Sequence, residues 1–149
     1  MSHHAMKKEI LNKMQLKLPA ISANESACRA MIAAFAAQIN PNIEELADLK
    51  CAVSEAVTNA VVHAYRCLGG DLYITVTLYR HREIRIDIRD KGCGIPDVAL
   101  ARQPLYTTDT DGERSGMGFS VMETFCDRVL VTSKLGRGTR VTMYKKLIS

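Results

Sequence analysis

Hydrophobic residues alternate with polar ones over three stretches of the chain, and a period of two predicts β-strands. Residues 14–18 alternate as a half-buried strand does, and residues 72–79 and 83–89 alternate strictly. The connector between the last two stretches is short, which predicts a hairpin. The apolar positions of that hairpin are Ile74, Val76, Leu78, Ile84, Ile86 and Ile88.

Two helices are predicted between the first strand and the hairpin. Residues 22–25 are typical of a helix start, and the Ala-rich run 26–38 follows them until Pro41 ends it. Asn42 and Glu45 then have the spacing of a capping box. The helix that they open is expected to reach about Tyr65, because an apolar stripe at helical spacing continues that far. Its members are Leu46, Leu49, Val53, Val57, Ala60 and Ala64.

Residues 90–118 have almost no periodicity and are rich in glycine, proline, threonine and charge, so we expect one long loop. Loops of that length in a compact domain are usually functional lids or disordered segments. A helix over 119–125 and two strands over 128–133 and 139–145 are predicted to follow. This order predicts an α+β fold, a two-layer sandwich with helices on one face of a mostly antiparallel sheet.

The composition is that of an ordinary globular domain, with 149 residues, 47% hydrophobic and 24% charged. We expect a single domain over 6–149, because the opening MSHHA reads as the remnant of an expression tag. No apolar run approaches the ~18 residues of a membrane span, and no signal-peptide pattern is present. The five cysteines lack a Cys-x-x-Cys pair, which favours reduced thiols in the cytoplasm over a disulfide frame or zinc site. The net charge of +4 comes from scattered Lys and Arg, so no nucleic-acid surface is suggested.

Three polar motifs carry the candidate chemistry. Glu55, Asn59 and His63 follow one another at intervals of four, which puts them on one flank of the predicted long helix. On their own Glu55 and Asn59 would be read as solvated surface, and His63 as a capping or packing histidine. Asp90 ends a strand and precedes Gly92 and Gly94, so a carboxylate there can accept a hydrogen bond from a ligand that approaches the backbone closely.

The third motif is a glycine-rich turn before a helix. Gly116, Met117 and Gly118 precede the helix predicted at 119, whose free N–H groups and positive dipole end favour a phosphate. Arg114 and Ser115 can add a charge and a hydroxyl. Taken alone, glycines here could equally serve a turn of positive φ.

In this order and spacing, the three motifs resemble the Bergerat-fold ATPase and kinase superfamily, which includes gyrase, MutL and histidine kinases. The stretches SANESACR (22–29), VSEAVTNAVVH (53–63) and ARQPLYTTDTDGERSGMG (101–118) resemble the sporulation anti-sigma F factor family of endospore-forming bacteria. That resemblance covers nearly the whole chain from Met6. It implies a homodimer that binds sigma F and a kinase that phosphorylates a serine of an anti-anti-sigma factor.

The resemblance also implies roles for individual residues. Asn59 would hold Mg²⁺ against the phosphates of ATP or ADP, and Asp90 would receive the adenine amino group, with Thr139 beside it. Residues of about 101–116 would form an ATP lid, and Arg29 of the first helix would contact sigma. The other nucleotide-binding positions implied are Gly92, Gly94, Thr107, Thr108, Arg114, Ser115, Gly116, Met117 and Gly118.

Glu55 separates branches of the superfamily. A serine hydroxyl needs a carboxylate to accept its proton, whereas a neutral histidine does not, and histidine kinases commonly carry Asn at this position. Glu55 therefore argues against a histidine kinase but fits an ATPase as well. The chain is too short for the additional domains that hydrolysing members carry. The alternatives are a stress-response anti-sigma kinase, a nucleotide-gated binding module without phosphotransfer, and an ATPase.

Overall fold

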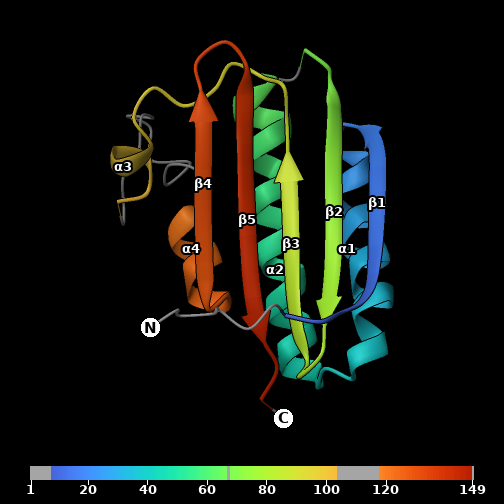
Figure 1. Ribbon diagram of the computed structural model, residues 1–149. Coiled ribbons are helices and arrows are strands. Elements are labelled where there is room, and N and C mark those ends of the chain that lie inside the picture. The colour runs from blue at the N-terminus through green and yellow to red at the C-terminus, as the bar shows by residue number, and fades with distance from the viewer. Residues whose placement is uncertain (1–7, 67, 104–117, 149) are drawn as a thin grey trace.

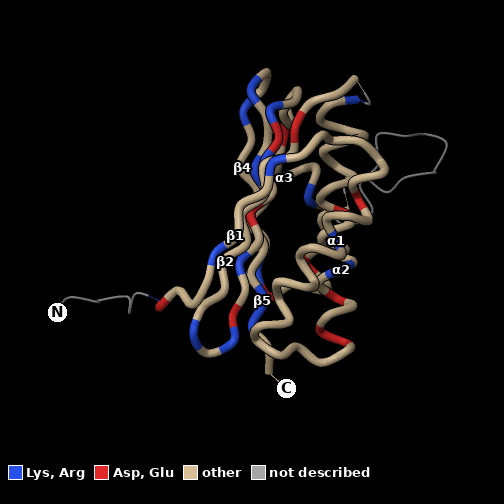
Figure 2. The backbone as a smooth tube through the Cα atoms, turned by 90° about the vertical axis from the view of Figure 1, so that its right-hand side faces the viewer, with Lys and Arg blue, Asp and Glu red and all other residues tan. Residues whose placement is uncertain are grey.

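The computed structural model describes residues 8–66, 68–103 and 118–148. One five-stranded antiparallel sheet runs through the molecule in the order β1-β2-β3-β5-β4. The strands are β1 (Ile10–Pro19), β2 (Asp71–Tyr79), β3 (Glu83–Arg89), β4 (Arg128–Lys134) and β5 (Gly138–Lys146). The helices α1 (Ala23–Ala36), α2 (Ile43–Thr58) and α4 (Phe119–Phe125) cover one face, and the other face is open (Figures 1 and 2). The predicted α+β two-layer sandwich is therefore confirmed.

The core lies between the sheet and the helix layer. Alternation places the apolar side chains of β2 and β3 toward the helices, where Ile74, Val76 and Ile86 are at most 1% exposed. The α2 stripe meets them, and Leu49, Val53 and Val57 are equally buried. Phe119 and Met122 of α4 complete the layer. The helix side of the fold thus depends on the periodic patterns that predicted its elements.

The capping box at the start of α2 forms as predicted. The N–H of Glu45 donates to Oδ1 of Asn42 at 2.7 Å, and the N–H of Asn42 donates to Oε1 of Glu45 at 3.0 Å. The second carboxylate oxygen of Glu45 accepts the N–H of Ile148 at 2.9 Å, which ties the C-terminal segment to the start of α2.

Two expectations need correction. The segment after Asp90 is not an unbroken loop, because Asp97 caps a short helix, α3 (Val98–Ala101), by accepting the N–H of Leu100 at 3.0 Å. The long helix does reach Ala64, but its last six residues, Asn59–Ala64, form a π-helical turn. The run after residue 22 becomes helical at Ala23 and ends in a 3-10 turn, Ala37–Ile39. In the described part of the chain no helix is long and apolar enough to cross a membrane.

Candidate functional site

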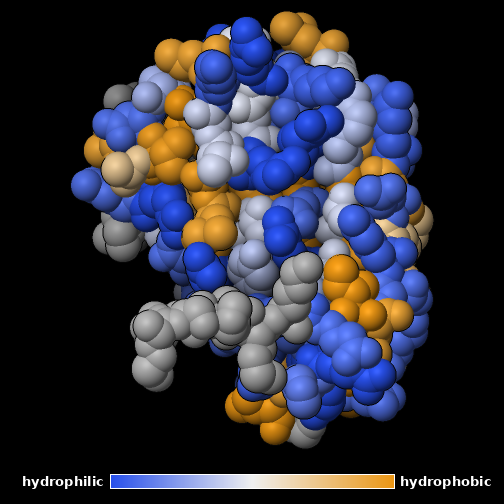
Figure 3. Space-filling model, viewed as in Figure 1, coloured by the Kyte–Doolittle hydropathy of each residue, from blue (hydrophilic) through white to orange (hydrophobic). Residues whose placement is uncertain are grey.

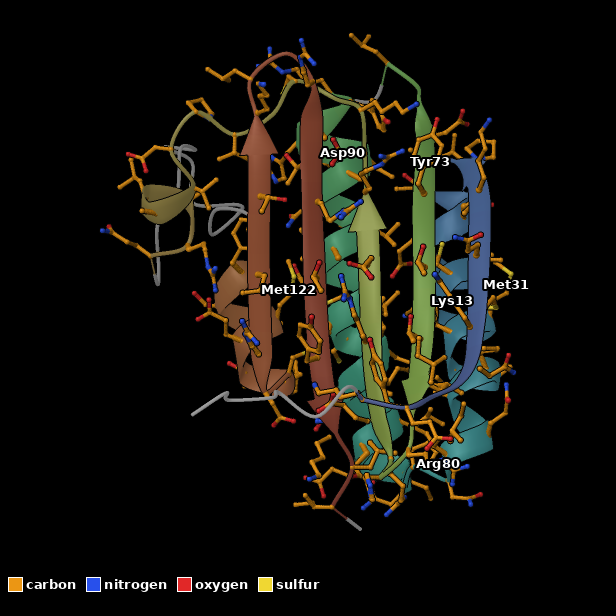
Figure 4. All side chains as sticks on the ribbon, in the orientation of Figure 1. Lys13, Met31, Tyr73, Arg80, Asp90 and Met122 are labelled. Carbon is orange, nitrogen blue, oxygen red and sulfur yellow. The ribbon has the colours of Figure 1, made fainter. Side chains whose placement is uncertain are left out.

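A pocket lies between the end of α2, the upper ends of β3 and β5, and the start of α4. Its lining includes Asn59, His63, Asp90, Gly94 and Thr139, with an apolar floor of Ala56, Ile88, Ile95, Phe119 and Val141. Asp90 sits just beyond the end of β3, toward α2 (Figure 4). Two of the three predicted motifs therefore meet around one cavity, although about 30 residues separate them in the sequence.

The π-helical turn shapes the α2 side of this pocket. The N–H of Tyr65 bonds to the carbonyl of Ala60, five residues back, at 2.9 Å. A π-turn is wider than an α-turn and is frequently found at functional sites. The turn begins at Asn59, and both Asn59 and His63 line the pocket.

Asp90 is held at the bottom of the pocket by the backbone around it. Its own N–H donates to the carbonyl of Thr139 at 2.9 Å. The N–H groups of Gly92 and Thr139 donate to Oδ1 of Asp90 at 2.9 and 3.2 Å. Both donors use the same carboxylate oxygen, so Oδ2 is available to accept a hydrogen bond from a ligand. Burial raises the pKa of Asp90, and the two N–H donors oppose that rise.

The glycine loop is confined between α2 and the β4–β5 turn. A Cβ at Gly92 would lie 2.4 Å from the carbonyl oxygen of Ala64. Gly94 has φ +78°, and a Cβ there would lie 2.4 Å from the carbonyl oxygen of Lys134. Only glycine fits these two approaches without moving the backbone. Both positions were predicted from the Asp-x-Gly-x-Gly motif, and the close packing explains why the motif needs them.

Two supports of this loop were not found by sequence reasoning. The hydroxyl of Tyr65 donates to the carbonyl of Asp71 at 2.8 Å and accepts the N–H of Lys91 at 2.6 Å. Ser133 accepts the N–H of Ile95 at 2.7 Å. Its hydroxyl also lies 2.8 Å from that of Thr139. Neither residue belongs to a recognisable motif, and only the pairing of distant strands brings them to the loop.

Gly118 brings the third motif to Glu55. Gly118 is the N-cap of α4, with φ +64°. A Cβ there would lie 2.2 Å from Oε2 of Glu55, so the Cα of Gly118 packs directly against that carboxylate. The N-terminal turn of α4 and the carboxylate of Glu55 thus adjoin. A phosphate at this helix end would lie beside a potential proton acceptor.

The remaining predicted residues divide into two groups. Arg29 lies on α1, away from the pocket, in an ion pair with Glu25 at 3.4 Å. The positions Thr107, Thr108, Arg114, Ser115, Gly116 and Met117, and most of the lid expected over 101–116, fall outside the described residues. Where the described chain stops, Arg102 pairs with Glu123 of α4 and donates to the carbonyl of Val129 at 2.8 Å.

Comparisons with known proteins agree with this geometry. Residues 18–145 match the family model described as a histidine kinase-like ATPase domain. The chain is 49% identical over 135 residues to the anti-sigma F factor of Clostridium acetobutylicum, covering 91% of this chain and 94% of that protein. It is 50% identical over 137 residues to the anti-sigma F factor of Shouchella clausii, covering 91% and 93%.

Solved structures share the fold. The RsbU and RsbW domains of Rv1364c from Mycobacterium tuberculosis align with a TM-score of 0.67 at 20% identity, over 91% of this chain and 32% of that one. The catalytic domain of the histidine kinase ThkA aligns with a TM-score of 0.55 at 14% identity, over 92% and 97%. The Bergerat-type architecture inferred from the motifs is therefore confirmed. The chain belongs to the anti-sigma F factor family, within the histidine kinase-like ATPase domains.

Proposed function

We propose that this protein is an anti-sigma factor and a serine-protein kinase. It would bind a sporulation sigma factor of the sigma F type, and it would use Mg-ATP to phosphorylate a serine of an anti-anti-sigma factor. The observation that carries the kinase half is the position of the Glu55 carboxylate against Gly118, at the N-terminal end of α4. The sigma-binding half is supported by relatives named anti-sigma F factor that are about half identical over nearly their whole length.

The nucleotide would be oriented by its two ends. Oδ2 of Asp90 is free to accept the adenine amino group, since Oδ1 already takes two backbone N–H groups. The free N–H groups of the first turn of α4 can bind the phosphates. Asn59 lines the same pocket, and its side-chain oxygen is the type of ligand that Mg²⁺ accepts alongside water and phosphate oxygens. Bound there, Mg²⁺ would neutralise the charge of the phosphates during transfer.

The transfer step requires one proton to move. The serine oxygen attacks the γ-phosphorus, the bond from that phosphorus to the β–γ bridging oxygen breaks, and ADP leaves. The hydroxyl proton passes to the carboxylate of Glu55, which acts as general base. A proton donor for the leaving oxygen is unnecessary, because ADP leaves as an anion whose charge the N–H groups at the start of α4, and Mg²⁺ when bound at Asn59, would stabilise.

The experiment that tests this proposal uses labelled ATP and an anti-anti-sigma factor. We expect phosphoserine to form, to disappear when the acceptor serine is replaced by alanine, and to fall by at least about a hundredfold with Glu55→Gln. Phosphate release that does not need the partner and that Glu55→Gln abolishes would indicate an ATPase instead. Binding of the partners without any phosphoserine would leave a nucleotide-gated binding module.

Sigma binding is tested separately. The side chain of Arg29 is 41% exposed and that of Glu25 is 27% exposed, so their i,i+4 ion pair is partly solvated and contributes little to stability. It is therefore able to exchange Glu25 for a carboxylate of sigma. Arg29→Ala should weaken sigma capture in a pull-down and leave the phosphorylation rate unchanged. Capture of a stress sigma factor in preference to sigma F would favour the stress-response branch of the family.

We further propose that the protein acts as a homodimer in the cytoplasm, where a sigma factor meets RNA polymerase. Light scattering on the purified chain, with and without nucleotide, measures the oligomeric state directly. A monomer under both conditions would contradict the first part of this proposal.

A further inference from the structure

The open face of the sheet carries a row of residues that the nucleotide site does not use. Register aligns one residue of each strand across the sheet, and this Arg89–Arg140 row consists of Lys17, Tyr73, Arg89, Arg140 and Thr132. The neighbouring row, which includes Ile74, Ile88 and Val141, is buried under the helices, so the Arg89–Arg140 row points the other way. In Figure 3, which shows the open face, hydrophilic side chains gather over the upper ends of β3 and β5.

Arg89 and Arg140 stand directly opposite each other on neighbouring strands, and like charges in that position repel. Neither forms an ion pair with any residue that the structure describes. The carboxylate of Asp87 lies in the next row on the same face of the sheet. It accepts hydrogen bonds from the Nε and Nη2 groups of Arg85 and from the hydroxyl of Thr142. The arginine pair is therefore left with uncompensated positive charge.

The surroundings of the pair are concave and also positive. Two open hollows of about 360 and 700 Å³ share only Arg89 and Arg140 among their lining residues. Four further cations, Lys17, Lys91, Lys134 and Arg137, line one or the other hollow, against one carboxylate in each, Asp87 and Asp90. Asp71 lies 3.9 Å from Lys17, at the rim. Arg89 and Arg140 each offer a planar pair of N–H donors, the geometry that binds carboxylates in bidentate fashion.

We propose that the Arg89–Arg140 row binds an acidic segment of a partner protein, with Asp or Glu side chains on the two guanidinium groups. Single-stranded nucleic acid fits less well, because base stacking needs bare aromatic faces. The ring of Tyr73 already has Lys17, Arg89 and Lys91 within 6 Å of its centre. A second copy of the chain fits less well too, since a two-fold axis would bring this cationic face against itself.

The sheet contains its own control. A second row on the same face, which we call the Arg85 row, crosses β3 four residues before Arg89. It consists of Lys13, Thr77, Arg85, Tyr144 and Arg128. It has three cations, as the Arg89–Arg140 row does, but its central arginine is paired with Asp87. Removing two exposed cations from either row changes the net charge equally. Only the Arg89–Arg140 row would lose two guanidinium groups from residues that stand opposite each other, whereas the Arg85 row would lose a single one, that of Arg128.

The test measures binding of a dye-labelled peptide of alternating Glu and Ser by fluorescence anisotropy. We expect binding that weakens as salt rises, and no binding of the same peptide with Gln in place of Glu. Arg89→Gln with Arg140→Gln should weaken it by about tenfold, the loss expected for two solvent-exposed ion pairs. Lys13→Gln with Arg128→Gln should leave affinity nearly unchanged, and Arg89→Lys with Arg140→Lys should give an intermediate value.

Several outcomes would overturn the proposal. The peptide could fail to bind the unaltered protein, or both glutamine variants could lose equal affinity, which would show a general charge effect. A thymidine oligonucleotide that binds more tightly than the peptide and loses affinity through the arginine pair would assign the row to nucleic acid. Conversion of a dimer to a monomer by the arginine variant in light scattering would assign it to a second copy.

Discussion

Replacing Gly118 by alanine places a methyl group in the space that the carboxylate of Glu55 occupies. The new Cβ would lie 2.2 Å from Oε2 and 3.0 Å from Cδ of Glu55, whereas ordinary Cβ contacts begin at 3.4 Å. The carboxylate must therefore move by roughly 1 Å. A displacement of that size can lower the rate of a reaction step that depends on a positioned group by about a hundredfold. We expect this loss in the rate of phosphoserine formation at saturating ATP.

Stability should respond differently from rate. Gly118 has φ +64°, and a side chain in the left-handed region costs about 1 kcal/mol. Gly136 provides a matched control, because its φ is +74° and nothing lies within 4 Å of a Cβ built there. Each alanine variant should lower the melting temperature by about 2–4 °C from this backbone term. Only Gly118→Ala should also slow the transfer.

The assay follows the initial rate of transfer from labelled ATP to the partner serine, with nucleotide affinity measured separately by titration. The difference between Gly118→Ala and Gly136→Ala isolates the contact with Glu55. If the two variants transferred phosphate at similar rates, Glu55 would not depend on its position against Gly118. The assignment of Glu55 as the base would then lose its structural support.

Three further predictions concern the nucleotide. Asn59→Ala should lose Mg-dependent ATP binding in calorimetry while circular dichroism shows an intact fold; an unfolded variant would make the residue structural. Tyr65→Phe keeps the ring but loses the hydrogen bonds to Asp71 and Lys91, so nucleotide affinity should fall by about fivefold to tenfold; unchanged affinity would mean that the glycine loop holds its position without them. Burial raises the pKa of Asp90 in the folded state. The protonated form of Asp90 therefore stabilises the fold, and this contribution to the free energy of unfolding is lost as pH rises through the raised pKa. The affinity for ATP should rise over the same pH interval, because the ionised carboxylate is the form that accepts the adenine amino group. Asp90→Asn should abolish ATP binding, because an NH₂ group would face the adenine amino group. The same variant should remove the pH dependence of stability and cause no loss of stability at neutral pH. Denaturant unfolding across pH measures the stability, and ATP titration across pH measures the affinity.

Periodicity predicted most of the fold because most of its elements have one buried face. The hairpin β2–β3 and helix α4 were predicted within a residue of their observed bounds, since strict alternation or a glycine marks each end. Asn42 and Glu45 are near in sequence, so the pattern alone was enough to predict their capping box. Site residues that belong to spaced motifs, such as Asp90 and Gly118, were found for the same reason.

What the sequence did not reveal depends on long-range packing. The apolar stripe does not predict the π-helical turn at Asn59. Ala60 belongs to that stripe and is buried in the π-helical turn, as the stripe predicts for an α-helix. Tyr65 looks like an ordinary helix-end aromatic until β2 and the glycine loop are placed on either side of its hydroxyl. Glu55 and Gly118 are far apart in the chain, and neither residue type indicates in the sequence that the two are in contact.

The strand order β1-β2-β3-β5-β4 makes Asp90 and Thr139 neighbours, although 49 positions separate them. The chain leaves the sheet after Arg89 and returns to it as β4, which pairs with β5 on the side away from β3. The stretch between β3 and β4 is therefore an insertion into a sheet in which β3 and β4 are each held by pairing with β5. Doubling the length of a flexible loop costs only about 0.6 kcal/mol in closure entropy. A change of length between β3 and β4 should therefore leave the contact between Asp90 and Thr139 in place, because that contact is fixed by the pairing of β3 with β5.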